Sequence, residues 1–415
     1  MVLKITVPLY LVTELRASFV CHHRMVLRKI TVPLYRDYEV TTAVREVGIR
    51  SGYRPECSSA LQCVASLFRN TNETANFWTH FLPSVYFTFH LLCSFRLARF
   101  PHDGTDSTHW PYLGYLLTVT AYLWASCGAH AFCSLSLRAR NVCYFVDYLA
   151  LSVFSFGSAV LYASYSFPRH LHDTRYEAVY LPVAAVISMA CVVMACSSRS
   201  FAGHWSQKCL RILSFVLPYM WDNLPLVYRV SSEGLRNSTA GSLYLGQFLA
   251  MMLATFFYGT HIPERLAPGK FDCWETTPST PTVNSAKVKV VKGDSPISPM
   301  IHFSAMPGIE PVTLTSVGRH ATDRAKVSGQ VILTFDELLC VSGNSHNLLH
   351  LLGTLATELQ RRAGLADMTA RQGMYMPRLS GVTSLAAIIG IALTNTAIMA
   401  AFIVHLPQDK TTRSH

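Results

Sequence analysis

The sequence carries little charge, because only 14% of its 415 residues are Asp, Glu, Lys or Arg. A soluble globular domain usually carries about 25% charged residues, so a molecule whose surface mostly faces water is excluded. Half of the residues are apolar or aromatic, and they cluster in long blocks. This pattern indicates a protein that lies in a lipid bilayer.

Two other features are missing. The twelve cysteines include no Cys-x-x-Cys pair, and most lie in apolar runs, where a free thiol behaves as a small hydrophobic group. The N-terminus lacks the apolar core of a cleavable signal peptide, so the first span is expected to act as its own insertion signal. The net charge of +11 is scattered over loops and flanks, so nucleic acid is not an expected partner.

The apolar blocks are long enough to cross a bilayer as helices, which takes about 20 residues each. Lipid cannot satisfy an open backbone edge, so spans joined by short loops form a helical bundle. We predict an all-α integral membrane fold with seven or eight transmembrane helices. The runs are 79–97, 112–134, 143–166, 178–197, 209–229, 241–261 and 382–405, with a weaker eighth run at 345–360.

The chain divides into five parts. Residues 1–78 are expected to be a cytoplasmic N-terminal region with an interfacial amphipathic segment near Leu61–Phe68. Met1–Tyr10 nearly repeats as Met25–Tyr35, so 1–24 is interpreted as an artefact of gene prediction. The first six spans occupy 79–273 and the last two 343–405, followed by a tail at 406–415. The intervening 274–342 is rich in Ser, Thr and Pro, which predicts a disordered insertion or a retained intron.

Basic residues predict the orientation, because short cytoplasmic loops are enriched in Lys and Arg. A cytoplasmic N-terminus places three basic loops on the inner side. They contain Arg138 and Arg140; Arg199, Lys208 and Arg211; and Arg265 and Lys270. One conflict follows from a crossing at 345–360, which puts four arginines on the outer side: Arg361, Arg362, Arg371 and Arg378.

Polar residues from three spans meet on the cytoplasmic side in this topology. Ser126 and His130 end the second span, Asp147 begins the third, and His346 and His350 begin the weak span. Residues four apart share a helix face. A catalytic zinc site can have three imidazole ligands and a fourth position open to water. A nearby carboxylate could hydrogen-bond to that water. The pattern therefore indicates a zinc centre.

Two interpretations stay open at this point. Interfacial histidines also commonly cap helices, but three spans that agree at one depth favour a metal, because ionisable groups in membranes are costly and usually functional. Asp222, between Pro218 and Pro225, could anchor the polar end of a lipid ligand or hydrogen-bond to a neighbouring helix.

Six segments in order resemble the progestin and adipoQ receptor (PAQR) family. They are GYRP at 52–55, SLFRNTNETANFWTHF at 66–81, SxxxH at 126–130, Asp147, PERLAPGKFD at 263–272 and SHNLLH at 345–350. The resemblance covers about 36–272 and 343–405. SSALQC at 58–63 and WDNLP at 221–225, with an eighth span, most resemble membrane progestin receptors of the gamma or delta type.

The resemblance implies a haemolysin-III-like bundle in which His130, His346 and His350 bind zinc. Asp147 would lie close to the metal's water, with Ser126 beside it. Relatives pass from PGKFD to HxxxH within a few residues, whereas 73 residues separate Asp272 from His346 here. That insertion places the positions of the last two histidines in question.

Three functions remain open. The first is a plasma-membrane receptor that admits a steroid, a progestin by resemblance, or another lipid, and signals through a G protein or another cytoplasmic transducer. The second is a zinc-dependent lipid amidase of the ceramidase kind, in which Asp147 takes a proton from the zinc water and Ser126 steadies the oxyanion. The third is a purely structural zinc.

Overall fold

The computed structural model describes residues 32–99, 109–200, 204–232, 239–272, 343–371 and 381–406. Regular structure within these ranges is helical, apart from one antiparallel bridge between Tyr35 and Tyr53. The predicted all-α class is confirmed. The repeat at 1–24, the expected disordered insertion at 274–342 and the tail after residue 406 lie outside the described residues, so those interpretations remain predictions.

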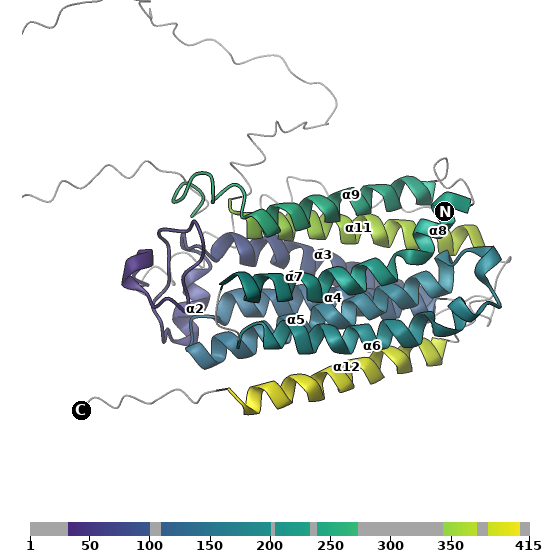
Figure 1. The fold of residues 1–415 in the computed structure, drawn as a ribbon, viewed down its shortest axis with the longest axis horizontal. Coiled ribbons are helices and arrows are strands. Elements are labelled where there is room, and N and C mark those ends of the chain that lie inside the picture. The colour runs from purple at the N-terminus through teal and green to yellow at the C-terminus, as the bar shows by residue number, and fades with distance from the viewer. Residues whose placement is uncertain are drawn as a thin grey trace, which may run out of the picture. The chain divides into compact units, whose positions relative to one another are not determined.

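The long helices of the described ranges lie side by side (Figure 1), and each predicted apolar run overlaps one of them. They are α3 (Thr74–Arg99), α4 (Trp110–Phe132), α5 (Leu137–Leu161), α6 (Arg175–Ser197), α7 (His204–Asp222), α9 (Thr239–Thr260), α11 (Ser345–Arg371) and α12 (Gly381–Val404). A π-helical turn at Tyr162–Ser166 continues α5. A shorter helix, α8 (Leu224–Ser232), follows α7 after a break at Asn223.

Four segments in the described residues are long and apolar enough to cross a membrane, by length and composition. They are Leu137–Ser166, Arg175–Ser197, Thr239–Thr260 and Gly381–Val404. Many of their side chains are not buried by the rest of the protein, and the last segment is the least buried of the four. This is expected where lipid surrounds the helices. The protein is therefore a multi-pass integral membrane protein.

The weak run at 345–360 is a full helix of 27 residues, α11. Its low hydropathy comes from one polar face that points into the bundle. Thr357 Oγ1 lies 3.0 Å from the Tyr122 hydroxyl, and Gln360 donates to the Tyr162 hydroxyl at 2.7 Å. These polar atoms are buried but hydrogen-bonded, so they do not prevent the segment from lying among apolar helices.

The arginines that conflicted with a crossing helix are partly neutralised within α11 itself. Glu358 accepts from Arg361 at 2.7 Å and from Arg362 at 2.6 Å. Arg361 also donates to the Tyr112 hydroxyl at 3.3 Å. Because both guanidinium groups are paired with one carboxylate, their net charge is smaller than the sequence suggests. Arg378 lies outside the described residues.

A short helix, α2 (Ala60–Ser66), occupies most of the predicted amphipathic segment. Ser59 caps its N-terminus by accepting from Gln62 N at 3.3 Å, and Ser59 N donates in turn to Gln62 Oε1 at 2.9 Å. Cys63 is buried, whereas Leu61 and Val64 are exposed. The segment is thus helical and two-sided, and its contact with a membrane surface remains a prediction.

Helix α12 buries few of its own residues, and one of these is Asn395. The Asn395 side chain donates to the hydroxyls of Ser152 on α5 and Ser188 on α6, both at 3.1 Å. Hydrogen bonds between helices in a membrane contribute about 0.6 kcal/mol on average and about 1.7 kcal/mol at most. Asn395 therefore joins α12 to both α5 and α6 in the middle of the bundle, while Arg138 of α5 donates to the Ile403 carbonyl at the end of α12, at 3.2 Å.

We expect Asn395→Ala to lower the free energy of unfolding by about 1 kcal/mol, because both serine hydroxyls lose their donor. Thermal denaturation of the protein in detergent would measure this loss. Thr396→Ala is the matched control, since Thr396 is exposed and its hydroxyl donates within α12, to the Ala392 carbonyl at 2.7 Å. Equal melting temperatures for the two variants would contradict the proposed role of Asn395.

Candidate metal centre

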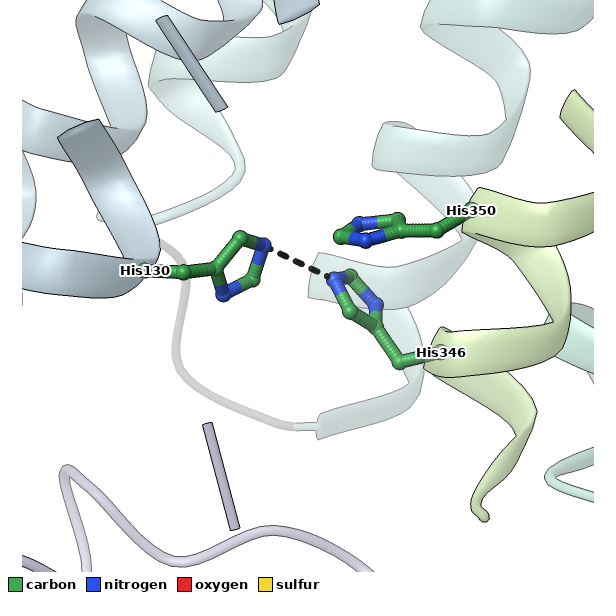
Figure 2. A group of neighbouring side chains, drawn as sticks. All are labelled: His130, His346 and His350. Atoms are coloured by element: carbon green, nitrogen blue, oxygen red, sulfur yellow. Dashed lines mark hydrogen bonds between the residues drawn. The ribbon is translucent and has the colours of Figure 1, made fainter. Parts of the chain in front are cut away.

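Three histidines from two helices converge at one end of the bundle. His130 lies in the last turn of α4, and His346 and His350 lie in the first turns of α11 (Figure 2). One ligand atom from each ring can be chosen so that all three lie within 4.8 Å of one another, and His130 and His350 are buried. This group could hold a metal ion. The structure thus brings together all three histidines that the sequence singled out.

The 73-residue separation does not displace α11. Glu264, in the loop after α9, is 2% exposed, and one of its carboxylate oxygens accepts from Ser345 N at 2.7 Å. Its other oxygen accepts a short hydrogen bond from the Ser345 hydroxyl. The residues before and after the long segment are therefore tied together directly, and the first turn of α11 is held beside the end of α9.

Glu73 fixes the ring of His130. The carboxylate lies 2.7 Å from His130 Nδ1, and both side chains are almost fully buried. Burial opposes ionisation of Glu73, but the hydrogen bond from His130, with Arg54 and Arg140 nearby, lowers the pKa of Glu73 below its ordinary value. An ionised carboxylate accepts, so Nδ1 carries the proton and Nε2 is left as a ligand atom.

Backbone from the same part of the chain fixes His350. His350 Nδ1 lies 3.1 Å from the Asn76 carbonyl oxygen and 3.1 Å from Thr79 Oγ1. A carbonyl can only accept, so Nδ1 again carries the proton and Nε2 is left as a ligand atom. A fourth ring, His80, stacks on His350 with centroids 3.7 Å apart.

Sequence reasoning did not assign roles to Glu73, Asn76 or His80, although all three lie within the quoted 66–81 segment. Asn76 follows Glu73 by three residues, and His80 follows Asn76 by four. Residues at these spacings lie on one face of a helix, so the three side chains line up at the start of α3. A polar stripe at the mouth of an apolar helix was the signal that could have identified them.

Ser126 and Asp147 both lie near His130. Ser126 is buried one turn before His130 on α4. Asp147 is half-buried on the neighbouring helix α5, and its carboxylate interacts electrostatically with His130. Both residues therefore flank the histidine group, and any chemical role for them remains a prediction.

Asp222 lies elsewhere. It follows Lys208 by 14 residues of α7, roughly 21 Å of helix, and Lys208 lies over the Tyr258 ring that contacts His346. Asp222 accepts a short hydrogen bond from Ser155 on α5, and its carbonyl accepts from the Tyr180 hydroxyl at 2.6 Å. These bonds give it a structural partner, while a role in ligand binding stays a prediction.

Comparison with known proteins gives consistent relatives. Residues 68–277 match the family described as Haemolysin-III related. The chain is 33% identical to Membrane progestin receptor delta from Homo sapiens over 388 residues, which covers 90% of this chain and 91% of that protein. It is 41% identical to Membrane progestin receptor gamma-A from Danio rerio over 254 residues, 56% of this chain and 73% of that protein. It is 42% identical to Membrane progestin receptor delta from Mus musculus over 248 residues, 58% of this chain and 71% of that protein.

The family match spans half of the chain, and the human relative is aligned over nearly its whole length. This chain belongs to the haemolysin-III-related family of multi-pass membrane proteins, the progestin and adipoQ receptor (PAQR) family that its motifs predicted.

Proposed function

We propose that this protein is a plasma-membrane receptor for a progestin or a related steroid, with a zinc site near its cytoplasmic face. The observation that carries the proposal is the similarity, along nearly the whole chain, to a protein named for progestin reception. The bundle interior supports it, because a sterol needs apolar walls and a few polar groups that fix its orientation. Signalling would pass to a G protein or another cytoplasmic transducer.

The interior of the bundle has this mixed character. Six tyrosines, with Tyr115 and Tyr162 among them, lie in one buried cluster together with apolar side chains such as Leu116 and Leu123. Tyr115 donates to Gln360 at 3.2 Å, and Gln360 donates to Tyr162. Such a network offers donors and acceptors to the oxygen atoms of a steroid.

Zinc fits the donor set. Zinc binds imidazole nitrogens at about 2.0–2.1 Å in tetrahedral geometry, which places two such nitrogens about 3.3 Å apart. The Nε2 atoms of His130 and His346 are 3.4 Å apart. With His350 as the third ligand, one position would stay open, and zinc there would supply a Lewis acid that lowers the pKa of a bound water to about 7.

We expect purified protein to contain about one zinc per chain, and each of His130→Ala, His346→Ala and His350→Ala to lose most of it, because two imidazoles hold zinc poorly. Elemental analysis of the purified protein would measure the content. His90→Ala is the control, since that ring packs against Tyr86 on α3, with centroids 4.5 Å apart. Unchanged zinc in all three site variants would refute the centre.

The N-terminus is proposed to face the cytoplasm, because the loops on that side carry most of the unbalanced Lys and Arg. An epitope tag at Met25 should then bind antibody only after cells are permeabilised. A tag at Asn237, between α8 and α9, should label intact cells and serves as the control. Labelling of the Met25 tag on intact cells would reverse the orientation.

Asp147→Asn separates a receptor from a hydrolase. The amide keeps the shape of the carboxylate but cannot take a proton, and loss of a general base typically costs about 10²–10⁴-fold in rate. We expect the variant to bind progestin within a few fold of wild type, by saturation binding to purified protein. We also expect wild-type protein to release little fatty acid from ceramide.

The ceramidase reading makes the opposite prediction. It needs the Asp147 carboxylate beside His130 to act as the base, with Ser126 at the oxyanion. Robust ceramide hydrolysis that Asp147→Asn abolishes while zinc content is kept, together with no saturable progestin binding, would make the protein an enzyme.

A further inference from the structure

Arg54 closes the end of the helix that carries His130. The last carbonyls of a helix have no partner within the helix, and the Arg54 guanidinium donates to the Ala131 carbonyl at 2.7 Å and to the His130 carbonyl at 2.8 Å. It also donates to Ser66 Oγ at 3.2 Å. The side chain is only 6% exposed. A cation at this position also complements the negative end of the helix dipole.

Glu264 caps the opposite kind of helix end: the N-terminus of α11, the helix that carries His346 and His350. The first N–H groups of a helix have no partner within it, and Glu264 accepts from the N–H of Ser345, the first residue of α11. Burial opposes its ionisation, but hydrogen bonds from His261 and Ser345 hold the pKa of Glu264 below its ordinary value. A negative charge at a helix N-terminus is favoured by the dipole.

The two capping residues belong to one connected structure, which we call the collar: residues 46–54 and 261–272. Gly269 N donates to the Gly48 carbonyl at 3.0 Å. Asp272 accepts from Arg50 N at 3.0 Å and from the Ser51 hydroxyl at 2.8 Å. Gly48 has φ +82°, and a Cβ there would lie 2.7 Å from the Glu264 carbonyl oxygen. The collar therefore packs as one tightly fitted unit.

We propose that Arg54 and Glu264 are positioning residues for the metal centre, which set the distance between the end of α4 and the start of α11. This inference rests on the proposed zinc site. Neither residue supplies a ligand atom. Arg54 hydrogen-bonds to the backbone of the turn that contains His130. Glu264 hydrogen-bonds to Ser345, the residue directly before His346. Because the collar joins them, movement of one helix end relative to the other must break collar contacts.

The expected cost is in metal affinity. Removing a residue that orients a metal ligand typically lowers the metal affinity by about 10–100-fold. Arg54→Met keeps much of the side-chain volume and removes all four donated bonds, the fourth of which goes to Cys133 Sγ at 3.0 Å, so the full loss is expected. Arg54→Lys keeps the charge but cannot reach both carbonyls with a planar fork, so its loss should be intermediate. Glu264→Gln keeps an acceptor for Ser345 N but removes the charge, so its loss should be about 10-fold.

Zinc affinity of full-length protein in detergent, measured by competition with a chelator, is the test. Cobalt substituted at the site gives a second readout, because its visible bands report coordination geometry. Wild type is measured first, with the His350→Ala variant as the blank. The controls are Arg45→Met, which removes donors to the Val40 carbonyl, and Glu56→Gln, which changes an acceptor of Thr41 N. Both controls should bind zinc like wild type.

A purely structural role for the two residues predicts a different result. Their variants would then melt at lower temperature but keep zinc affinity within about 2-fold of wild type and an unchanged cobalt spectrum, and that outcome would overturn the proposal. If Arg54→Met fails to fold, Arg54→Lys and Glu264→Gln decide by the same readouts. Wild-type protein that binds no zinc would instead overturn the metal centre itself, and the positioning role with it.

Discussion

A polar side chain inside a membrane bundle must find its partners in the protein, because lipid offers none. Helix α11 shows how strongly this constraint acts here. Four polar residues lie along its buried face: His350, Thr357, Gln360 and Asp367. Their hydrogen-bond partners come from α3, α4, the π-helical turn after α5, and α9. Asp367 also pairs with Arg229 of α8 at 2.5 Å. The position of α11 among its neighbours follows from these contacts, and the histidine group follows from that position.

The same constraint explains which parts of the fold could be predicted from the sequence. Long apolar runs and the i, i+4 spacing of His346 and His350 are local features, so the long helices could be located from the sequence, and four of them are apolar enough to cross a membrane. The run at 345–360 looked weak, because hydropathy averages both faces of a helix. A helix with one polar face that other helices satisfy has low mean hydropathy and still packs as a bundle member.

Breaks within helices were harder to predict. The run at 209–229 was taken as one span, but α7 ends at Asp222 and α8 begins at Leu224. Pro225 lacks an N–H and is tolerated in the first turn of a helix, which favours a new start here. Asn223 fills the break, since its side chain donates to the Tyr219 carbonyl at 2.8 Å and accepts from Gln247 at 3.2 Å. The second contact comes from α9, and the local sequence does not reveal it.

The functional residues that the sequence did not reveal also depend on contacts between distant parts of the chain. Glu73, Arg54 and Glu264 act on residues that lie 57, 76 and 81 positions away. An acidic or basic residue in a loop has many solvated alternatives, so neither its type nor its spacing identifies such a partner. The PAQR resemblance quoted the segments that contain all three, but without contacts it could not say what those residues touch.

The start of α3 determines which nitrogen of His130 and of His350 carries the proton. His130 comes from α4, and His346 and His350 come from α11, so α3 supplies no predicted ligand. Yet Glu73, directly before α3, holds His130 Nδ1, and the Asn76 carbonyl in its first turn accepts from His350 Nδ1. Both contacts leave Nε2 as the ligand atom and turn two rings from different helices toward one point. A histidine group built from two helices thus depends on a third for the orientation of its rings, and this explains the polar residues at the start of the apolar helix α3.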